Sequence, residues 1–296
     1  MRDDFCAVIL THGRPNKVPT YNSLFRHGYT GRIFIVVDDE DESLPDYIRK
    51  FGEESVLVFS KIEVMSHMDV GDNFEGRMAA ITFARNAIFD LIREQGFKYF
   101  IQLDDDYTQF SYRFDDEGRY GTWPVCDLDA VLSGMVDFLE ATPFLTVAMS
   151  QGGDWIGGAE AKSTIGSRRK AMNSFVCSTE RPFPFLGRLN EDVVTYTTLQ
   201  RRGLPFLTFL AVQIVQIATQ KTPGGMSGTY ADSGTYVKSF YSVMYAPSCV
   251  SIGTMKGTSK NKSLDESKRM SRIHHKVSWN NTAPKIIPER LKRRAK

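Results

Sequence analysis

The chain has 296 residues, of which 42% are hydrophobic and 24% are charged, and this composition is that of a globular protein rather than a disordered or fibrous one. Its length allows one large α/β domain or two small ones, and either buries a substantial core. The longest apolar stretch, 206–218, is too short to span a bilayer, and the charged start shows no signal-peptide pattern. We therefore expect a cytoplasmic location and no membrane partner.

The net charge of +2 is distributed unevenly along the chain. From Lys256 to Lys296 there are 13 Lys and Arg against three Asp and Glu, so this segment carries +10 and the rest carries −8. Such a basic segment favours a polyanionic partner such as nucleic acid, and a solvated basic tail explains it equally well. The four cysteines are scattered without a C-x-x-C pair, which indicates reduced, mostly buried thiols rather than a zinc site or disulfides.

The first hundred residues alternate between strand and helix patterns. The segments with strand patterns are 5–10, 32–37, 55–59 and 99–103, and those with helix patterns are 18–27, 44–51 and 79–95. Continuous apolar strands separated by helices are typical of a parallel sheet with helices on both faces. The sequence therefore predicts an α/β fold with a mostly parallel, Rossmann-like sheet.

The remaining residues are less regular. Helix patterns occupy 128–140 and 191–202, the latter with Asn190 at its N-cap, and strand patterns occupy 145–150 and 207–217, the last as one or two strands. A Gly-rich stretch covers 151–158, and 221–234 reads as a loop. We find no internal repeat or linker, and we expect a single domain over 1–280 followed by a basic tail over 281–296.

Three of the early strands run directly into polar segments. These segments are Thr11 to Arg14, Asp38 to Asp41, and Asp104 to Asp106. Ligands of open α/β sheets bind beyond the carboxyl ends of the strands, so we expect the three segments along one edge.

Consecutive aspartates at the end of a buried strand repel one another unless a cation binds them. Oxygen ligands suit a hard divalent ion, so the run from Asp104 to Asp106 predicts a site for Mn²⁺ or Mg²⁺. A solvated acidic turn is the alternative. The position directly after an apolar strand favours the metal site.

Five motifs occur in the order found in GT-A fold glycosyltransferases. They are L-T-H-G-R-P at 10–15, V-V-D-D-E-D at 36–41, F-A-R-N at 83–86, L-D-D-D at 103–106 and L-N-E-D-V at 189–193. More narrowly, the chain resembles the TET-associated glycosyltransferases of bacteriophages, which are thought to glycosylate hydroxymethylated pyrimidines in DNA. The resemblance covers residues 5–200 and implies a GT-A fold, a UDP-sugar donor and, for a phage protein, the host cytoplasm.

The resemblance implies a nucleotide-sugar site, whose residues are Thr11, Gly13, Arg14, Asp38, Asp39, Arg85, Asp104 and Asp105. In this site Thr11, Gly13 and Arg14 would cradle the uracil and the ribose. Asp38 or Asp39 would accept the uracil N3–H. His12 is expected to be a hydrogen-bonded structural histidine.

The resemblance also implies the roles around the diphosphate. Arg85 would reach the base or the diphosphate, Asp104 would contact the ribose and the metal, and Asp106 would hold the metal. Many GT-A enzymes add a late histidine as a metal ligand, and His274 and His275 are the candidates, with a DNA contact or a plain surface pair as alternatives.

Glycosyl transfer to a hydroxyl requires a base for the acceptor proton. In the GT-A pattern an acidic residue at a helix start supplies it, and Asn190-Glu191-Asp192 matches that pattern. The resemblance thus implies Asp192 as general base, Glu191 as a positioning residue and inversion at the anomeric carbon. Ordinary helix capping by these residues is the alternative.

Gly152, Gly153 and Trp155 are the expected contacts of the acceptor and the donor sugar, because glycines allow close approach and Trp155 offers a stacking surface. The leading hypothesis is transfer of glucose or arabinose from a UDP-sugar to 5-hydroxymethylcytosine in phage DNA. A saccharide or lipid-linked acceptor is the main alternative. A nucleotidyltransferase and a non-catalytic DNA-binding protein are further readings that the motifs favour less.

Overall fold

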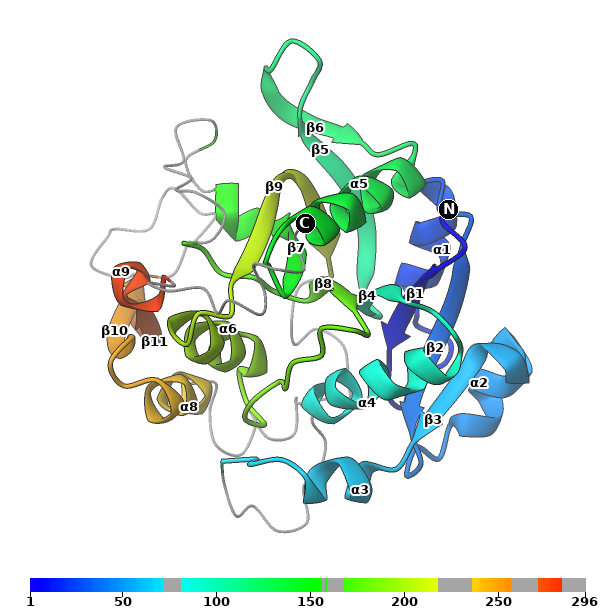
Figure 1. Ribbon diagram of the computed structural model, residues 1–296, viewed down its shortest axis with the longest axis horizontal. Coiled ribbons are helices and arrows are strands. Elements are labelled where there is room, and N and C mark those ends of the chain that lie inside the picture. The colour runs from blue at the N-terminus through cyan, green and yellow to red at the C-terminus, as the bar shows by residue number, and fades with distance from the viewer. Residues whose placement is uncertain (72–80, 156–157, 159–167, 218–235, 257–270, 284–296) are drawn as a thin grey trace.

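A nine-stranded mixed sheet organises the protein, with strand order β3-β2-β1-β4-β8-β7-β9-β5-β6 (Figure 1). The coordinates are those of a computed structural model, which describes residues 1–71, 81–155, 158, 168–217, 236–256 and 271–283, with the backbone alone at 255–256 and 271–272. Within these residues the predicted α/β architecture is confirmed. The predicted loop at 221–234 and most of the basic segment lie outside them.

The first four strands of the sheet are parallel, as predicted. They are β1 (Phe5–Leu10), β2 (Arg32–Asp38), β3 (Val56–Phe59) and β4 (Tyr99–Asp104). The helices between them are α1 (Pro19–Arg26), α2 (Leu44–Phe51), the short α3 (Lys61–Ser66) and α4 (Ile81–Glu94), with a 3₁₀ turn at Glu53–Ser55. The four parallel strands are apolar on both faces, and helices therefore cover both faces of this half of the sheet.

Alternate residues of β1 point into two separate apolar cores. Ala7 and Ile9 pack with α1, α2 and α5 (Leu128–Ala141) on one face. Cys6, Val8 and Leu10 pack with α4 and α6 (Glu191–Arg201) on the other. The strand period of two therefore places a helical layer on each face of the sheet.

The second half of the sheet departs from the prediction of parallel strands. It contains β5 (Tyr107–Phe114), β6 (Tyr120–Pro124), β7 (Thr146–Gln151), β8 (Ser174–Ser178) and β9 (Phe206–Gln216), with a 3₁₀ turn at Gly152–Trp155. The strands β5 and β8 run opposite to the others. The sequence did not predict β5, β6 and β8, whose polar and apolar residues mix, whereas 207–217 forms one strand.

The residues after 235 form a small unit packed on α6 that the sequence did not predict. It consists of α8 (Val237–Tyr245), β10 (Val250–Lys256), β11 (Ser271–Val277) and α9 (Trp279–Thr282). Figure 1 shows these elements gathered beside α6, far from β2 and β3. The rings of Tyr196 and Trp279 stack with centroids 5.7 Å apart and join α6 to α9. Residues 284–296 are outside the described part, so the boundary at 280 stays a prediction.

Two smaller expectations concern the whole chain. Cys6, Cys177 and Cys249 are buried and Cys126 is exposed, and all four are free thiols, as predicted. No helix in the described residues is both long and apolar enough to cross a membrane.

Candidate active site

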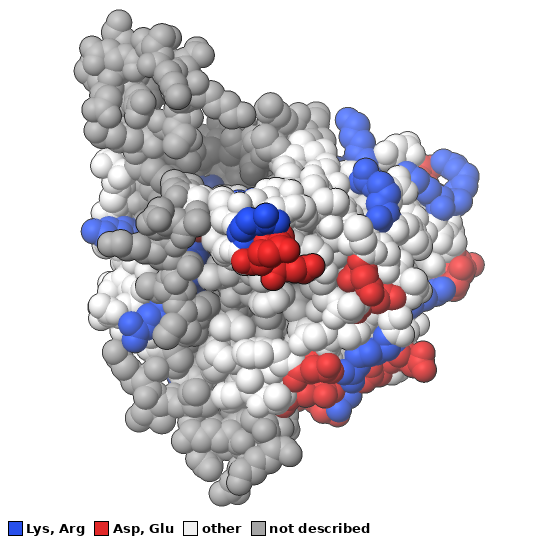
Figure 2. Space-filling model, turned by 90° about the horizontal axis from the view of Figure 1, so that it is seen from above, with Lys and Arg blue, Asp and Glu red and all other residues white. Residues whose placement is uncertain are grey.

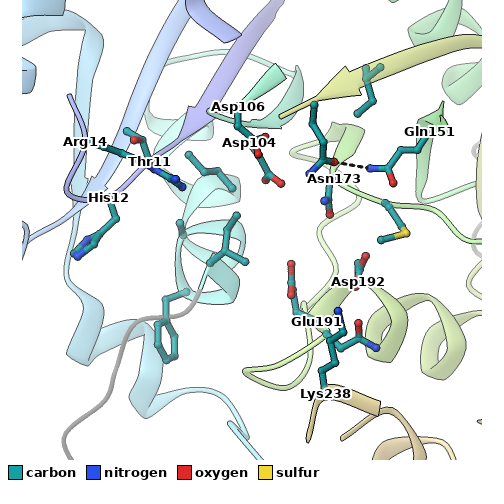
Figure 3. A pocket seen from close by; sticks show the side chains of 18 of the residues that line it. Thr11, His12, Arg14, Asp104, Asp106, Gln151, Asn173, Glu191, Asp192 and Lys238 are labelled. Carbon is teal, nitrogen blue, oxygen red and sulfur yellow. Dashed lines mark hydrogen bonds between the residues drawn. The ribbon is translucent and has the colours of Figure 1, made fainter. Parts of the chain in front are cut away.

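A pocket of about 650 Å³ lies at the carboxyl edge of the sheet, where the three polar segments meet as predicted. Figure 3 shows Thr11, His12 and Arg14 on one side and the Asp104–Asp106 pair at its centre. Glu191, Asp192 and Lys238 come from α6 and α8 on another side. The volume is within the range of small-molecule sites.

The turn after β1 is fixed by a buried carboxylate. Thr11 Oγ1 donates to Asp105 Oδ2 over 2.7 Å, and Arg14 Nε lies 2.8 Å from the same oxygen. Asp105 is 1% exposed and does not line the pocket, and its contact with the nucleotide stays a prediction. Gly13 has left-handed backbone (φ 67°) and donates its N–H to Asp41, also without lining the pocket. Thr11 and Arg14 do line it.

Of the two acids proposed to accept the uracil N3–H, the structure places Asp38 in the pocket. Its Oδ2 lies 2.7 Å from His12 Nδ1, and its buried Oδ1 has no hydrogen-bond partner among the described residues. Burial opposes ionisation of Asp38, but the bond with His12 lowers the pKa of Asp38 and raises that of His12. Asp39 instead accepts the Lys61 N–H and does not line the pocket.

Arg85 is fully buried and joins the acids of β4 to those of α6. Its Nη2 donates to Asp104 Oδ1 over 2.8 Å, and its Nε donates to Glu191 Oε1 over 3.2 Å. The guanidinium also lies over the rings of Phe175 and Phe185, 5.4 and 5.6 Å from their centroids. Burial would lower the pKa of Arg85, but the two carboxylates raise it above its usual value. Arg85 does not line the pocket, and its contact with the nucleotide stays a prediction.

Three carboxylates that line the pocket, those of Asp104, Asp106 and Asp192, have raised pKa values. Burial raises the pKa of Asp104 to about 7 against the opposing charge of Arg85, and burial raises that of Asp106 to about 6. Burial, with Glu191 beside it, also raises the pKa of Asp192 to about 7. A cation or a proton would relieve each of these groups.

The residues present fit a divalent cation shared with a ligand. Asp104 and Asp106 line the pocket together, and Asp106 Oδ1 is buried with no hydrogen-bond partner in the described chain. Those residues contain no cluster of three or more His, Cys, Asp or Glu with metal-binding geometry. Mg²⁺ commonly takes one or two carboxylates and completes its shell with water and phosphate oxygens, so two aspartates suffice.

The histidine pair lies on β11. Its two rings are 4.2 Å apart between centroids, and His275 Nδ1 is 3.4 Å from Asn190 Nδ2. Burial lowers the pKa of His275 to about 4. Neither His274 nor His275 lines the pocket, and their role as metal ligands stays a prediction.

The start of α6 differs from an ordinary helix cap. Asn190 occupies the N-cap position as predicted, but its backbone is left-handed (φ 57°) and its side chain donates to Ser242 Oγ over 2.6 Å instead of capping. Asp192 accepts the N–H of Val193 over 2.7 Å. Asn173, also left-handed (φ 54°), lines the pocket as Asn190 does. Such backbone strain at non-glycine residues clusters at functional sites.

Of the residues predicted to contact the acceptor, Gly152 and Gly153 line the pocket. Trp155 does not, and its stacking on a sugar or base stays a prediction. Its indole is 7% exposed and packs against Phe114 and Tyr120, and its N–H donates to Ser150 Oγ over 3.2 Å.

Several pocket residues were not predicted. They are Lys61, Asn173, Gln213, Gln216 and Lys238. Gln213 and Gln216 interrupt an apolar strand pattern, which is a usable signal for a polar site. Lys238 carried no such signal, because α8 reaches the pocket only through the packing of the C-terminal unit.

We predict that Arg85→Gln lowers the free energy of unfolding by about 3–5 kcal/mol, because it leaves buried carboxylates without a partner. Arg49→Gln is the matched control, since Arg49 is 76% exposed and pairs only with Asp46 at the surface. Urea denaturation of both variants measures the effect. Equal unfolding midpoints for the two variants would show that the buried guanidinium is dispensable.

Comparison with known proteins identifies the family of this chain. The model of the TET-Associated Glycosyltransferase family matches residues 5–225. None of the curated proteins compared matches the chain.

Solved structures that match include glucosyl-3-phosphoglycerate synthase from Mycobacterium tuberculosis in complex with Mn²⁺, UDP and phosphoglyceric acid. Its sequence identity to this chain is 10% and the TM-score is 0.43, with 93% of this chain and 87% of that chain covered. Another is mannosyltransferase PcManGT from Pyrobaculum calidifontis with GDP-Man and Mn²⁺, at 11% identity and a TM-score of 0.47 over 83% and 74%. Because the family model spans well over half of the 296 residues, this chain belongs to the TET-Associated Glycosyltransferase family.

Proposed function

We propose that this glycosyltransferase moves a sugar from a UDP-sugar to the hydroxyl of 5-hydroxymethylcytosine in DNA, with Mn²⁺ or Mg²⁺ as cofactor. The observation that carries the proposal is the pocket in which Asp104 and Asp106 face the Glu191–Asp192 pair. The Asp104–Asp106 pair suits the cation that would accompany the donor diphosphate. The Glu191–Asp192 pair suits removal of the proton from the acceptor hydroxyl. The DNA acceptor is supported by the family description and by the basic segment after Lys256.

The nucleotide end of the pocket is built for a uracil and a ribose. Asp38 Oδ1, which lies 3.7 Å from Lys61 Nζ and has no hydrogen bond within the described residues, accepts the uracil N3–H. Thr11 and Arg14 line the adjoining wall. Asp104 orients the ribose, and Asp104 and Asp106 hold the cation. When bound, the cation neutralises the charge that develops on the departing diphosphate.

Asp192 removes the acceptor proton. Glu191 is held by Arg85, whereas the Asp192 carboxylate accepts the backbone N–H of Val193. A pKa of about 7 lets Asp192 accept a proton near neutral pH and still be ionised there. One base and direct attack by the acceptor hydroxyl give inversion at the anomeric carbon.

DNA contacts are assigned to the basic C-terminal segment. Figure 2 shows acidic and basic side chains interspersed over the described part of one face, without a continuous basic surface there. Lys and Arg after residue 256 would contact phosphates independently of sequence. The base must leave the helical stack to reach the pocket, as in other enzymes that modify bases.

Mass analysis of nucleosides tests the reaction. The protein is incubated with hydroxymethylcytosine DNA, Mn²⁺ and separate UDP-sugars, with cytosine DNA as control. We expect a gain of one hexose or pentose on hydroxymethylcytosine alone, and a loss of about 10²–10⁴ in rate for Asp192→Asn. Release of UDP without a nucleoside gain would move the acceptor to a saccharide or lipid. No UDP release with any donor would refute glycosyl transfer.

The pH dependence of transfer tests the role of Asp192 separately. Only the ionised carboxylate accepts a proton, so kcat/KM is expected to rise about tenfold per pH unit below pH 7 and to level off above it. The residual activity of Asp192→Asn should lack this slope. A wild-type profile that is flat between pH 5.5 and 8.5 would assign the base to another group.

A further inference from the structure

The end of the pocket away from Thr11 and His12 is lined by amide side chains. Gln151, Asn173, Gln213 and Gln216 are the amide residues among those that line the pocket beyond the start of α6. Figure 3 shows Gln151 and Asn173 on the side opposite His12, beyond the Asp104–Asp106 pair. Amides carry no net charge but both donate and accept hydrogen bonds, so this end differs chemically from the charged nucleotide end.

Gln213 has the feature that points to a ligand. Its side chain is 8% exposed, and its buried Oε1 has no hydrogen-bond partner among the residues that the structure describes. Buried polar groups nearly always have a partner, and one that lacks it on a pocket wall is positioned to accept a donor from a ligand. Gln200 is also buried and unpaired, but it lies on α6 and does not line the pocket.

A bulge in β9 holds Gln213 in place. Met149 pairs with Phe209, and the next residue of β7, Ser150, pairs with Gln213, so 210–212 have no partners on β7. Ser150 Oγ bonds the carbonyl oxygens of Leu210 and Val212 at 3.3 and 2.9 Å. Bulges beside active sites commonly redirect a side chain, and this one is fixed by hydrogen bonds at its base.

The neighbours of Gln213 connect the amide end to the metal-binding acids. A Cβ on Gly152 would lie 3.8 Å from Gln213 Nε2, so the glycine leaves space beside the amide. Gln151 Nε2 donates to Gln216 Oε1 over 3.4 Å. The residue after Gln216, Ile217, donates its N–H to the Asp106 carbonyl over 3.1 Å. The strand end that carries Gln216 is therefore joined directly to the backbone of Asp106.

We propose that Gln213, with Gln151 and Gln216, binds the hydroxyl groups of a neutral donor sugar and selects it. This inference rests on the proposed function, because it places the sugar beyond a diphosphate at Asp106. Each sugar hydroxyl donates to one amide oxygen and accepts from one amide N–H, which satisfies the open Gln213 Oε1. The nearby carboxylates of Glu191 and Asp192 disfavour a sugar acid.

Gln213→Leu removes the amide with little change in volume and is the test variant. Calorimetry with Mn²⁺ gives Kd for UDP, UDP-glucose and UDP-arabinose, and steady-state rates give KM for hydroxymethylcytosine DNA. We expect about tenfold weaker binding of the accepted UDP-sugar and unchanged Kd for UDP and KM for DNA. Gln200→Leu, which removes a buried unpaired amide outside the pocket, should change none of these values.

The possible failures are distinguishable. If the wild-type protein binds no UDP-sugar, the proposed function fails and this inference fails with it. If the wild-type protein binds a UDP-sugar and Gln213→Leu binds it equally well, only the sugar subsite is refuted. A rise in KM for DNA with unchanged sugar binding would assign the amides to the acceptor base and overturn the inference. Equal weakening of UDP and UDP-sugar would mean that the substitution distorts the whole pocket, and it would also overturn the inference.

Discussion

The site depends on one buried positive side chain, the guanidinium of Arg85. Arg85 contributes a guanidinium with no exposed surface to a region where Asp104 and Glu191 would otherwise repel each other. Two charges of one sign at short range in a poorly solvated place repel each other strongly. The guanidinium pairs with both carboxylates at once, so the end of β4 and the start of α6 can approach closely. The pairing of Asp104 and Glu191 with Arg85 therefore brings the proposed donor site and the proposed acceptor site together.

Three buried acceptor atoms along the same pocket have no hydrogen-bond partner in the part of the chain that the structure describes. They are Asp38 Oδ1 at the nucleotide end, Asp106 Oδ1 at the centre and Gln213 Oε1 at the amide end. Leaving a buried acceptor unpaired costs about 1–3 kcal/mol, which a ligand recovers on binding. A uracil N–H, a divalent cation and a sugar hydroxyl would complete them in that order. The order is that of the parts of a UDP-sugar, which supports a donor of this class.

The early strands could be predicted because their apolar runs are continuous and end in polar motifs. The edge position of Asp38, Asp104 and Asp106 followed from the rule for parallel sheets. The direction of a side chain did not follow, because neighbouring residues at a strand end can face the pocket or the core. Asp105 turned inward to hold the first loop, and Arg85 and Trp155 proved to be packing partners.

The sequence did not predict the C-terminal unit for a different reason. Its elements are short, and they bury their apolar residues against α6 rather than in a repeating pattern of their own. Lys238 therefore enters the pocket through tertiary packing alone. The hydrogen bond from Asn190 to Ser242 shows that this unit also contacts the residue that precedes Glu191 and Asp192.

The most direct measurement is a calorimetric titration of UDP into the protein with and without Mn²⁺, repeated on Asp106→Asn. If the nucleotide and the cation bind together at the Asp104–Asp106 pair, UDP binds tightly only when Mn²⁺ is present. In Asp106→Asn, Mn²⁺ should no longer strengthen the binding of UDP. Binding of UDP that is equally tight without Mn²⁺, or unchanged in Asp106→Asn, would contradict a metal-bridged diphosphate at the centre of this pocket.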